Sequence, residues 1–446
     1  MPNTTPKPLF LIIITIFLLM AAPTNAAQFL FTPELAAGVE YTDNLFLTPT
    51  NEVDDFITTV GLTLTGQLLG RTAGLELIYN PSYSFFADNQ DLDFLRHVAR
   101  VYTWKDLRRN TRLSLANDYL ETENPRDTSL DFAPDDPTEG PVIGEDLTRR
   151  GRTRYRVNTT EGRLDHQYGA RNTFYTALSY SFLQDIDTTP GTTVADHRIW
   201  EPALGIEHWF TQRWGVTLDG YYSHRDYVDE NDRQEYNGAL SLMRSFTPTL
   251  TGFVGYRHTV LYFDEPTDED YQIYYPNAGM RYQFQENASI SIAGGYLIQE
   301  FRDSDTPNEE GFVVEAALFK RWPFRSGHIE LTGGSGYRID DTGAEVRGLN
   351  IYYEGGLGLL YNLTRRISAT AYGAYRYDDY PNDTPELSEQ TIGAGAGIGY
   401  QALQWMNIGL TYSYRQRLSD IPTEEYTENS VMLVITMSPT RPYRWN

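Results

Sequence analysis

The chain has 446 residues, and 36 Lys and Arg against 60 Asp and Glu give a formal net charge of 36 − 60 = −24. It contains no cysteine, which excludes disulfides, thiolate metal sites, a cysteine nucleophile and a lipid anchor on an N-terminal cysteine. The acidic balance excludes nucleic acid as an expected partner, because nucleic-acid-binding surfaces are basic.

The N-terminus has the form of a secretory signal peptide. Lys7 precedes an apolar run at residues 9–20, and small residues follow, with Thr24 and Ala26 suited to the cleavage site. We predict that residues 1–26 are removed; an uncleaved membrane anchor is the alternative. No later stretch approaches the roughly 18 consecutive apolar residues of a spanning helix, so helices are not expected to hold the mature protein in a membrane.

Beyond the signal, apolar and polar residues alternate, which is typical of strands with two different faces. In residues 349–363, for example, Ile351, Tyr353 and Leu357 share one face and Glu354 lies on the other. The alternation also occurs at residues 56–65, 73–85, 111–120, 214–225, 250–257, 289–299, 329–339 and 407–418, and it is weaker at 97–104 and 197–210.

The connectors alternate between two kinds. Short ones are rich in Arg, Thr and Asn, as at residues 70–72 and 363–366, whereas long ones are rich in Asp, Glu and Pro, as at 121–148 and 303–310. This order of connectors predicts about twenty strands, and counts from 18 to 22 also fit. Short turns that alternate with long loops are typical of a transmembrane barrel. Both ends of the chain then lie on the short-turn side.

We therefore predict an all-β protein: a single closed antiparallel transmembrane β-barrel over residues 29–438, with short periplasmic turns, long acidic extracellular loops and a C-terminal extension at 439–446. A soluble β-sandwich is the alternative, but its strands are only about 5–6 residues long. In lipid every strand needs a partner on both sides, because an unpaired amide there costs several kcal/mol. Tyrosine pairs such as Tyr221–Tyr222 and Tyr274–Tyr275 suggest aromatic girdles, or simply the β propensity of tyrosine.

Residues 37–46, Ala-Gly-Val-Glu-Tyr-Thr-Asp-Asn-Leu-Phe, resemble the first strand of the β-barrel porin 2 family, which includes barrels found beside exopolysaccharide and PEP-CTERM export systems. Residues 77–83 resemble the third strand of that family, and 363–369 its recurring turn-plus-strand unit. The resemblance implies a multi-pass barrel in the Gram-negative outer membrane, with membrane lipid, lipopolysaccharide and the barrel-insertion machinery as partners. Periplasmic polysaccharide-export components are further candidates. The chain departs from the usual terminal aromatic, because Asn446 follows Tyr443 and Trp445.

Charged residues on the faces opposite the apolar ones are expected to line the lumen, because a charge on the lipid face at mid-depth costs about 2–4 kcal/mol. They either brace the wall as cross-strand ion pairs or form a polar track for solutes. The candidates are Arg154, Arg156, Arg225, Arg257, Arg281, Arg338, Arg376, Arg415, Glu76, Glu207, Asp219, Glu330 and Glu354.

The longest connector, residues 121–148, is a candidate constriction. Folded inward, its carboxylates would favour cations, whereas the alternative is a solvated surface loop. The candidate residues are Asp127, Asp131, Asp135, Asp136 and Glu139. No calcium-loop spacing or other metal motif accompanies the acidic loops, so neither a metal nor a cofactor is expected.

The strands begin soon after the predicted cleavage site, which leaves no room for a plug domain. The sequence thus predicts a passive outer-membrane channel for small hydrophilic solutes or an exported saccharide. The alternatives are a structural or assembly barrel of an envelope polysaccharide-export complex and an outer-rim lipid hydrolase. For the hydrolase, Ser223 and His224 are adjacent and so point to opposite faces of a strand; an enzyme is not expected.

Overall fold

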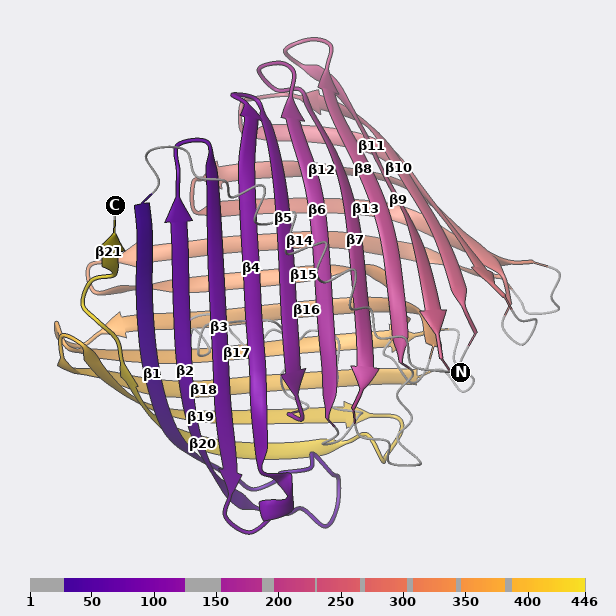
Figure 1. Cartoon of the computed structure of the whole chain (residues 1–446). Coiled ribbons are helices and arrows are strands. Elements are labelled where there is room, and N and C mark those ends of the chain that lie inside the picture. The colour runs from indigo at the N-terminus through magenta and orange to yellow at the C-terminus, as the bar shows by residue number, and fades with distance from the viewer. Residues whose placement is uncertain are drawn as a thin grey trace, which may run out of the picture.

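Twenty antiparallel strands form one closed barrel in the computed structural model, which describes residues 28–124, 154–186, 196–228, 231–264, 269–302, 308–341, 346–381 and 387–445 (Figure 1). The near strands β1–β7 cross the far strands β14–β20 at a steep angle, as expected for strands tilted around a barrel. The prediction of an all-β barrel with about twenty strands is confirmed. The predicted signal peptide lies outside the described residues.

The strands of the first half are β1 (Gln28–Thr42), β2 (Asp55–Leu69), β3 (Ala73–Phe86), β4 (Phe94–Arg108), β5 (Thr111–Thr122), β6 (Tyr155–Gln167), β7 (Thr173–Asp185), β8 (His197–Trp209), β9 (Trp214–Tyr227) and β10 (Arg233–Ser245). Those of the second half are β11 (Leu250–Phe263), β12 (Tyr271–Gln285), β13 (Ala288–Phe301), β14 (Glu309–Phe324), β15 (Gly327–Asp341), β16 (Val346–Asn362), β17 (Ile367–Tyr380), β18 (Leu387–Leu403), β19 (Met406–Ser419) and β20 (Tyr426–Met437). A short β21 (Tyr443–Trp445) and a 3₁₀ turn, η1 (Gln90–Leu92), complete the elements. No helix in the described part of the chain is both long and apolar enough to cross a membrane.

The outer face of the barrel carries an aliphatic band in its middle and an aromatic belt toward each rim. A middle band of exposed aliphatic residues runs around the strands: Leu35, Val60, Leu77, Leu178, Leu204, Leu218, Leu240, Val254, Ile292, Leu357, Ile398, Leu410 and Leu433. Exposed aromatics lie toward the short-turn rim (Trp214, Phe284, Trp322, Phe324, Tyr361, Tyr400 and Trp445) and toward the long-loop rim (Phe56, Phe85, Trp200, Tyr236, Phe312, Tyr375 and Tyr412). This order is that of a barrel surface that faces a bilayer.

The tyrosine pairs of the sequence split between the two faces. Tyr222 and Tyr274 share the outer face with exposed residues, whereas Tyr221 and Tyr275 belong to the opposite face. Tyr221 donates a hydrogen bond to Glu235 at 2.6 Å, and Tyr275 is fully buried. Each pair therefore supplies one girdle residue and one interior residue, because neighbours on a strand point to opposite sides.

The barrel closes where β1 pairs with β20, from Leu35↔Met437 to Thr42↔Ser430. Polar residues that follow this pairing join the two strands at the long-loop rim. Asp43 accepts hydrogen bonds from both the backbone N–H and the side-chain amide of Asn429, each at 2.7 Å. Asn44 donates to the carbonyl oxygen of Thr427 at 3.0 Å. Residues of segment 37–46, which resembles the first strand of the family, therefore hold β1 and β20 together. We call this β1–β20 junction the seam of the barrel.

Replacing Asp43 by Ala should lower the free energy of unfolding by about 1–3 kcal/mol, because hydrogen bonds to a charged acceptor are lost between β1 and β20, which no loop connects. The measurement is the temperature at which the folded band disappears in heat-modifiable gel migration. Asp420→Ala is the control, because Asp420 also accepts from a backbone N–H and a side chain, those of Ser388, but joins strands that are neighbours in the sequence. Equal melting of the two variants would contradict a special role for the seam.

The C-terminal extension returns to the wall as β21. Phe29↔Trp445 and Phe31↔Tyr443 pair, so β21 covers three residues of β1 before the stretch that pairs with β20. Pro439 and Pro442 lie between β20 and β21 and have no N–H to donate, which interrupts the ladder. The rings of Phe29 and Trp445 lie 5.4 Å apart on the outer surface.

Candidate functional site: the barrel interior

The strand register shows which side chains face the interior, because directly paired residues share a face. Asp219, Ala239, Arg257 and Tyr275 form one row across β9–β12. Eleven of the predicted lumen residues lie on this inner face: Arg225, Arg257, Arg281, Arg338, Arg376, Arg415, Glu76, Glu207, Asp219, Glu330 and Glu354.

Arg156 and Arg154 are placed differently. Arg156 lies on the outer face, which also carries Tyr180 and the exposed Trp200, and not on the lumen face where it was predicted. It is paired with Glu121 and donates a hydrogen bond to Gln184 at 3.1 Å. Arg154 precedes β6, and its guanidinium lies 5.2 Å from the centroid of the Phe94 ring, which the register places on the inner face. The stretch Tyr-Arg-Val-Asn-Thr-Thr at 155–160 carries polar residues on both faces, so alternation alone does not assign its sides.

Ion pairs brace the inner wall. Arg257 binds Glu315 at 2.6 Å across β11 and β14, and both side chains are half-buried. Other pairs are Arg163–Asp165 at 3.0 Å and Arg112–Asp106 at 2.8 Å. Glu76 accepts a hydrogen bond from Gln67, and Glu330 is paired with Arg321. These contacts agree with the bracing interpretation of the interior charges, although several of the groups also remain accessible to water.

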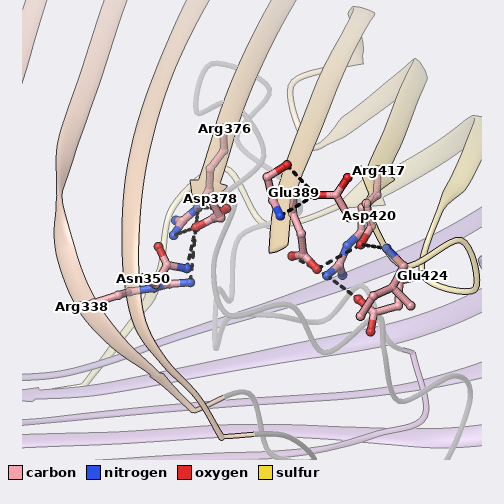
Figure 2. A network of polar contacts seen from close by, with 11 residues as sticks. Arg338, Asn350, Arg376, Asp378, Glu389, Arg417, Asp420 and Glu424 are labelled. Atoms are coloured by element: carbon pink, nitrogen blue, oxygen red, sulfur yellow. Dashed lines mark hydrogen bonds and ion pairs between the residues drawn. The ribbon is translucent and has the colours of Figure 1, made fainter. Parts of the chain in front are cut away.

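Two buried networks lie at the long-loop end of the far wall (Figure 2). In the first, Asp378 is bound by Arg376 at 2.8 Å and by Asn350 at 3.0 Å, and Arg338 lies 3.9 Å away. Because several donors converge on Asp378, its charge is compensated although the carboxylate is buried.

In the second network, Arg417 binds Glu389 at 2.7 Å and Glu424 at 3.3 Å. The Arg417 side chain is only 1% exposed, so its charge is compensated by the two carboxylates and not by water.

Burial is uneven along the barrel axis. Near the long-loop rim the interior residues Arg233, Glu235, Arg417 and Glu389 are buried. Toward the short turns, Arg112, Asp219, Arg281 and Arg321 are exposed. The interior is therefore open toward the short-turn rim and filled toward the long-loop rim.

The filling includes an apolar cluster on the inner face. Leu261, Tyr271, Ile273, Tyr275, Leu297 and Val313 of β11–β14 pack with Leu349 of β16, and all are at most 5% exposed. The strand hairpin that carries Leu349 is an inward element that the sequence analysis missed. The candidate constriction residues Asp127, Asp131, Asp135, Asp136 and Glu139 lie outside the described residues.

The candidate hydrolase residues do not form a shared site. Ser223 is buried on the inner face, paired with Glu235, whereas His224 belongs to the outer face and is paired with Gln234. Among the described residues, no group of three His, Asp or Glu side chains is placed to hold a metal ion.

Comparison with solved structures supports the fold. The FrpB iron transporter from Neisseria meningitidis (F3-3 variant) has 9% identity and a TM-score of 0.52, with 95% of this chain and 83% of that chain covered. A mutant of the ferric enterobactin receptor PfeA from Pseudomonas aeruginosa has 9% identity and a TM-score of 0.51, with 92% and 80% covered. The import receptor Fiu from E. coli K12 has 10% identity and a TM-score of 0.50, with 94% and 82% covered. At such identities the likeness concerns the barrel fold alone.

Comparison of the sequence with curated proteins gave no match. A family model does match, over residues 152–438, which is more than half of the chain and spans β6–β20. The segments at 37–46 and 77–83 lie before this region, whereas the turn-plus-strand unit at 363–369 lies within it. The chain belongs to the family described as "Putative beta-barrel porin 2".

Proposed function

We propose that this protein is a passive channel of the Gram-negative outer membrane for small hydrophilic solutes or an exported saccharide. The observation that carries the proposal is the contrast between the two faces of one closed barrel. Leu218 and Leu240 are exposed on the outer face, whereas Asp219 and its row partner Arg257 lie on the inner face. An apolar outside and a charged inside suit a wall between lipid and water.

The proposed partners are outer-membrane lipid, lipopolysaccharide and the barrel-insertion machinery, with periplasmic polysaccharide-export components in the case of an exported saccharide. The apolar belt with its aromatic flanks supports lipid as the surrounding medium. We propose no catalytic activity, in keeping with the porin family and with the separation of Ser223 from His224.

Single-channel recording with thiol modification tests the channel. The chain has no cysteine, so Arg281→Cys provides a unique interior thiol and Met280→Cys a unique thiol on the outer face. Steady ohmic current is expected, and a negatively charged methanethiosulfonate should lower it in the Arg281→Cys channel by a measurable fraction. The Met280→Cys channel should not respond, because its 50%-exposed side chain faces lipid. Absence of current, or equal block of the two variants, would contradict the proposal.

A second candidate function is a structural or assembly barrel of an envelope export complex. The apolar cluster around Leu261, Tyr275 and Leu349 favours it, because such packing fills part of the interior. A folded, heat-modifiable barrel that passes no current would support this second candidate.

A further inference from the structure

The β15–β16 hairpin ends in a segment that leaves the wall; we call residues 336–341 and 346–350 the tip. β14 pairs with β15 only from Phe324↔Gly327 to Ala316↔Ser335, although β14 itself extends to Glu309. β16 begins to pair with β17 at Ile351↔Asp379. β15 and β16 nevertheless stay paired to each other up to Asp341↔Val346. Within the described residues, the tip is thus a two-stranded ribbon that pairs with neither neighbouring strand.

One face of this ribbon lies against the inside of the barrel. Leu349 is 1% exposed within the apolar cluster of β11–β14, and Tyr337 and Ile339 of the tip pack against the same cluster, as does Ile351 directly after the tip. The rings of Tyr337 and Tyr275 meet edge to face, with centroids 5.0 Å apart.

By alternation these residues continue the outer face of β15 and β16, which carries the exposed Ile329, Tyr353 and Leu357. The tip has therefore folded inward, so that its outer face covers the inner wall of the adjacent strands.

A glycine-rich region lies at the point where the tip departs. Gly333, Gly334 and Gly336 surround the end of the β14 pairing, and Gly355 and Gly356 face them across the hairpin. Glycine tolerates a sharp bend in a strand because it has no Cβ to clash, and it weakens the strand for the same reason. The bend is thus built into both strands at the same level.

The opposite face of the tip is polar and meets β17. Asn350 is fully buried and donates to Asp378 at 3.0 Å, and Arg338 lies 3.9 Å from the same carboxylate. Arg376 binds Asp378 and also Glu354, at 3.3 Å. Figure 2 shows Arg338, Asn350, Arg376 and Asp378 converging from β15, β16 and β17. The tip is held by apolar packing on one side and by ion pairs on the other.

We propose that the tip is the constriction of the channel and narrows its long-loop half. This inference rests on the proposed channel function and deepens it. On the polar face Asn350 stays buried against β17, whereas the Arg338 side chain is 31% exposed, so solutes that pass the tip meet Arg338 while the apolar face stays on the wall. The charges of Arg338 and of Glu354, whose side chains are 31% and 40% exposed, then belong to the narrow region and influence which ions pass.

Undocking the tip tests the proposal. Leu349→Asp places a carboxylate in the apolar cluster, where it is not solvated, so the tip should leave the wall. Single-channel conductance should rise at least about twofold, because a narrow segment dominates the resistance of a pore. Val228→Asp is the matched control, because Val228 is 67% exposed near the long-loop rim and should leave conductance unchanged. Unchanged conductance in a Leu349→Asp variant shown to be undocked would overturn the constriction role.

Docking is measured independently of current by a unique cysteine at Val313, which is 1% exposed within the cluster. A membrane-impermeant maleimide should label Val313→Cys slowly, and about tenfold faster or more when Leu349→Asp is added, because local opening exposes the thiol. A Val228→Cys thiol should react equally in both backgrounds. Rapid labelling of Val313→Cys alone would overturn the docked tip.

Gel migration shows whether each variant is folded; if Leu349→Asp does not assemble, Ile339→Ser is the milder variant for the same two measurements. If no variant conducts, both the channel function and the constriction role are overturned. The labelling contrast would then still report a docked tip. Failure of the channel function and failure of the tip geometry are therefore distinguishable.

Discussion

Leu240→Arg should lower the free energy of unfolding of the barrel in lipid vesicles by about 2–4 kcal/mol and reduce the assembled fraction. Leu240 lies in the middle of β10, is 52% exposed and shares its face with Leu218 and Tyr256. An arginine there must either enter hydrocarbon or distort the bilayer around it. Urea unfolding in vesicles measures the loss, and heat-modifiable gel migration measures the assembled fraction.

The neighbouring residue provides the control. Ser241 follows Leu240 on the same strand but faces the interior, paired with Gly255. Ser241→Arg adds the same charge to the same strand and should change the free energy of unfolding by less than about 1 kcal/mol, because surface-type substitutions in water are mild. Equal destabilisation by the two variants would show that the outer face does not contact lipid.

Arg417→Ala should destabilise the barrel by about 3–5 kcal/mol, because it leaves a buried carboxylate without its counter-charge. Arg417 is 1% exposed and Glu389 is 6% exposed, and they meet at 2.7 Å. The midpoint of urea unfolding in vesicles is the measurement. The double variant Arg417→Met/Glu389→Gln should be more stable than Arg417→Met alone, because the most buried carboxylate is then neutral and only the 15%-exposed Glu424 lacks its counter-charge.

A water-exposed pair is the comparison for Arg417. Arg163 binds Asp165 at 3.0 Å, with side-chain exposures of 36% and 46%. Arg163→Ala should therefore cost no more than about 1 kcal/mol. If Arg417→Ala were as mild as Arg163→Ala, the buried network at the long-loop rim would not contribute to stability.

These contacts divide the interior into a region with water-exposed charges and a region with buried charges. Toward the short turns, charged side chains such as Arg281 remain exposed, so in the proposed channel they would meet solutes. Toward the long loops, the networks of Asp378 and Arg417 brace the wall, and the packed tip fills part of the interior. In the proposed channel, the region toward the long loops would limit the conductance, and the region toward the short turns would bind entering solutes.

Alternation along the chain was sufficient to predict the barrel and most of its two faces. A strand between lipid and a polar interior must change character at every residue, so Leu218 and Asp219 reveal their sides without any knowledge of their neighbours. Segments with polar residues on both faces, such as 155–160, carry no such signal, which is why the side of Arg156 emerged only from its pairing with Glu121.

Three features depended on contacts between distant parts of the chain. The seam joins Asp43 to Asn429, β21 returns to cover the first residues of β1, and the β15–β16 tip turns its outer face onto the inner wall. Alternation reports which side of a strand is apolar, but not where the hydrogen-bonded ladder ends or what then covers that side. Gly333, Gly334 and Gly336 lie at the place of the bend, and only the apolar cluster of β11–β14 decided its direction.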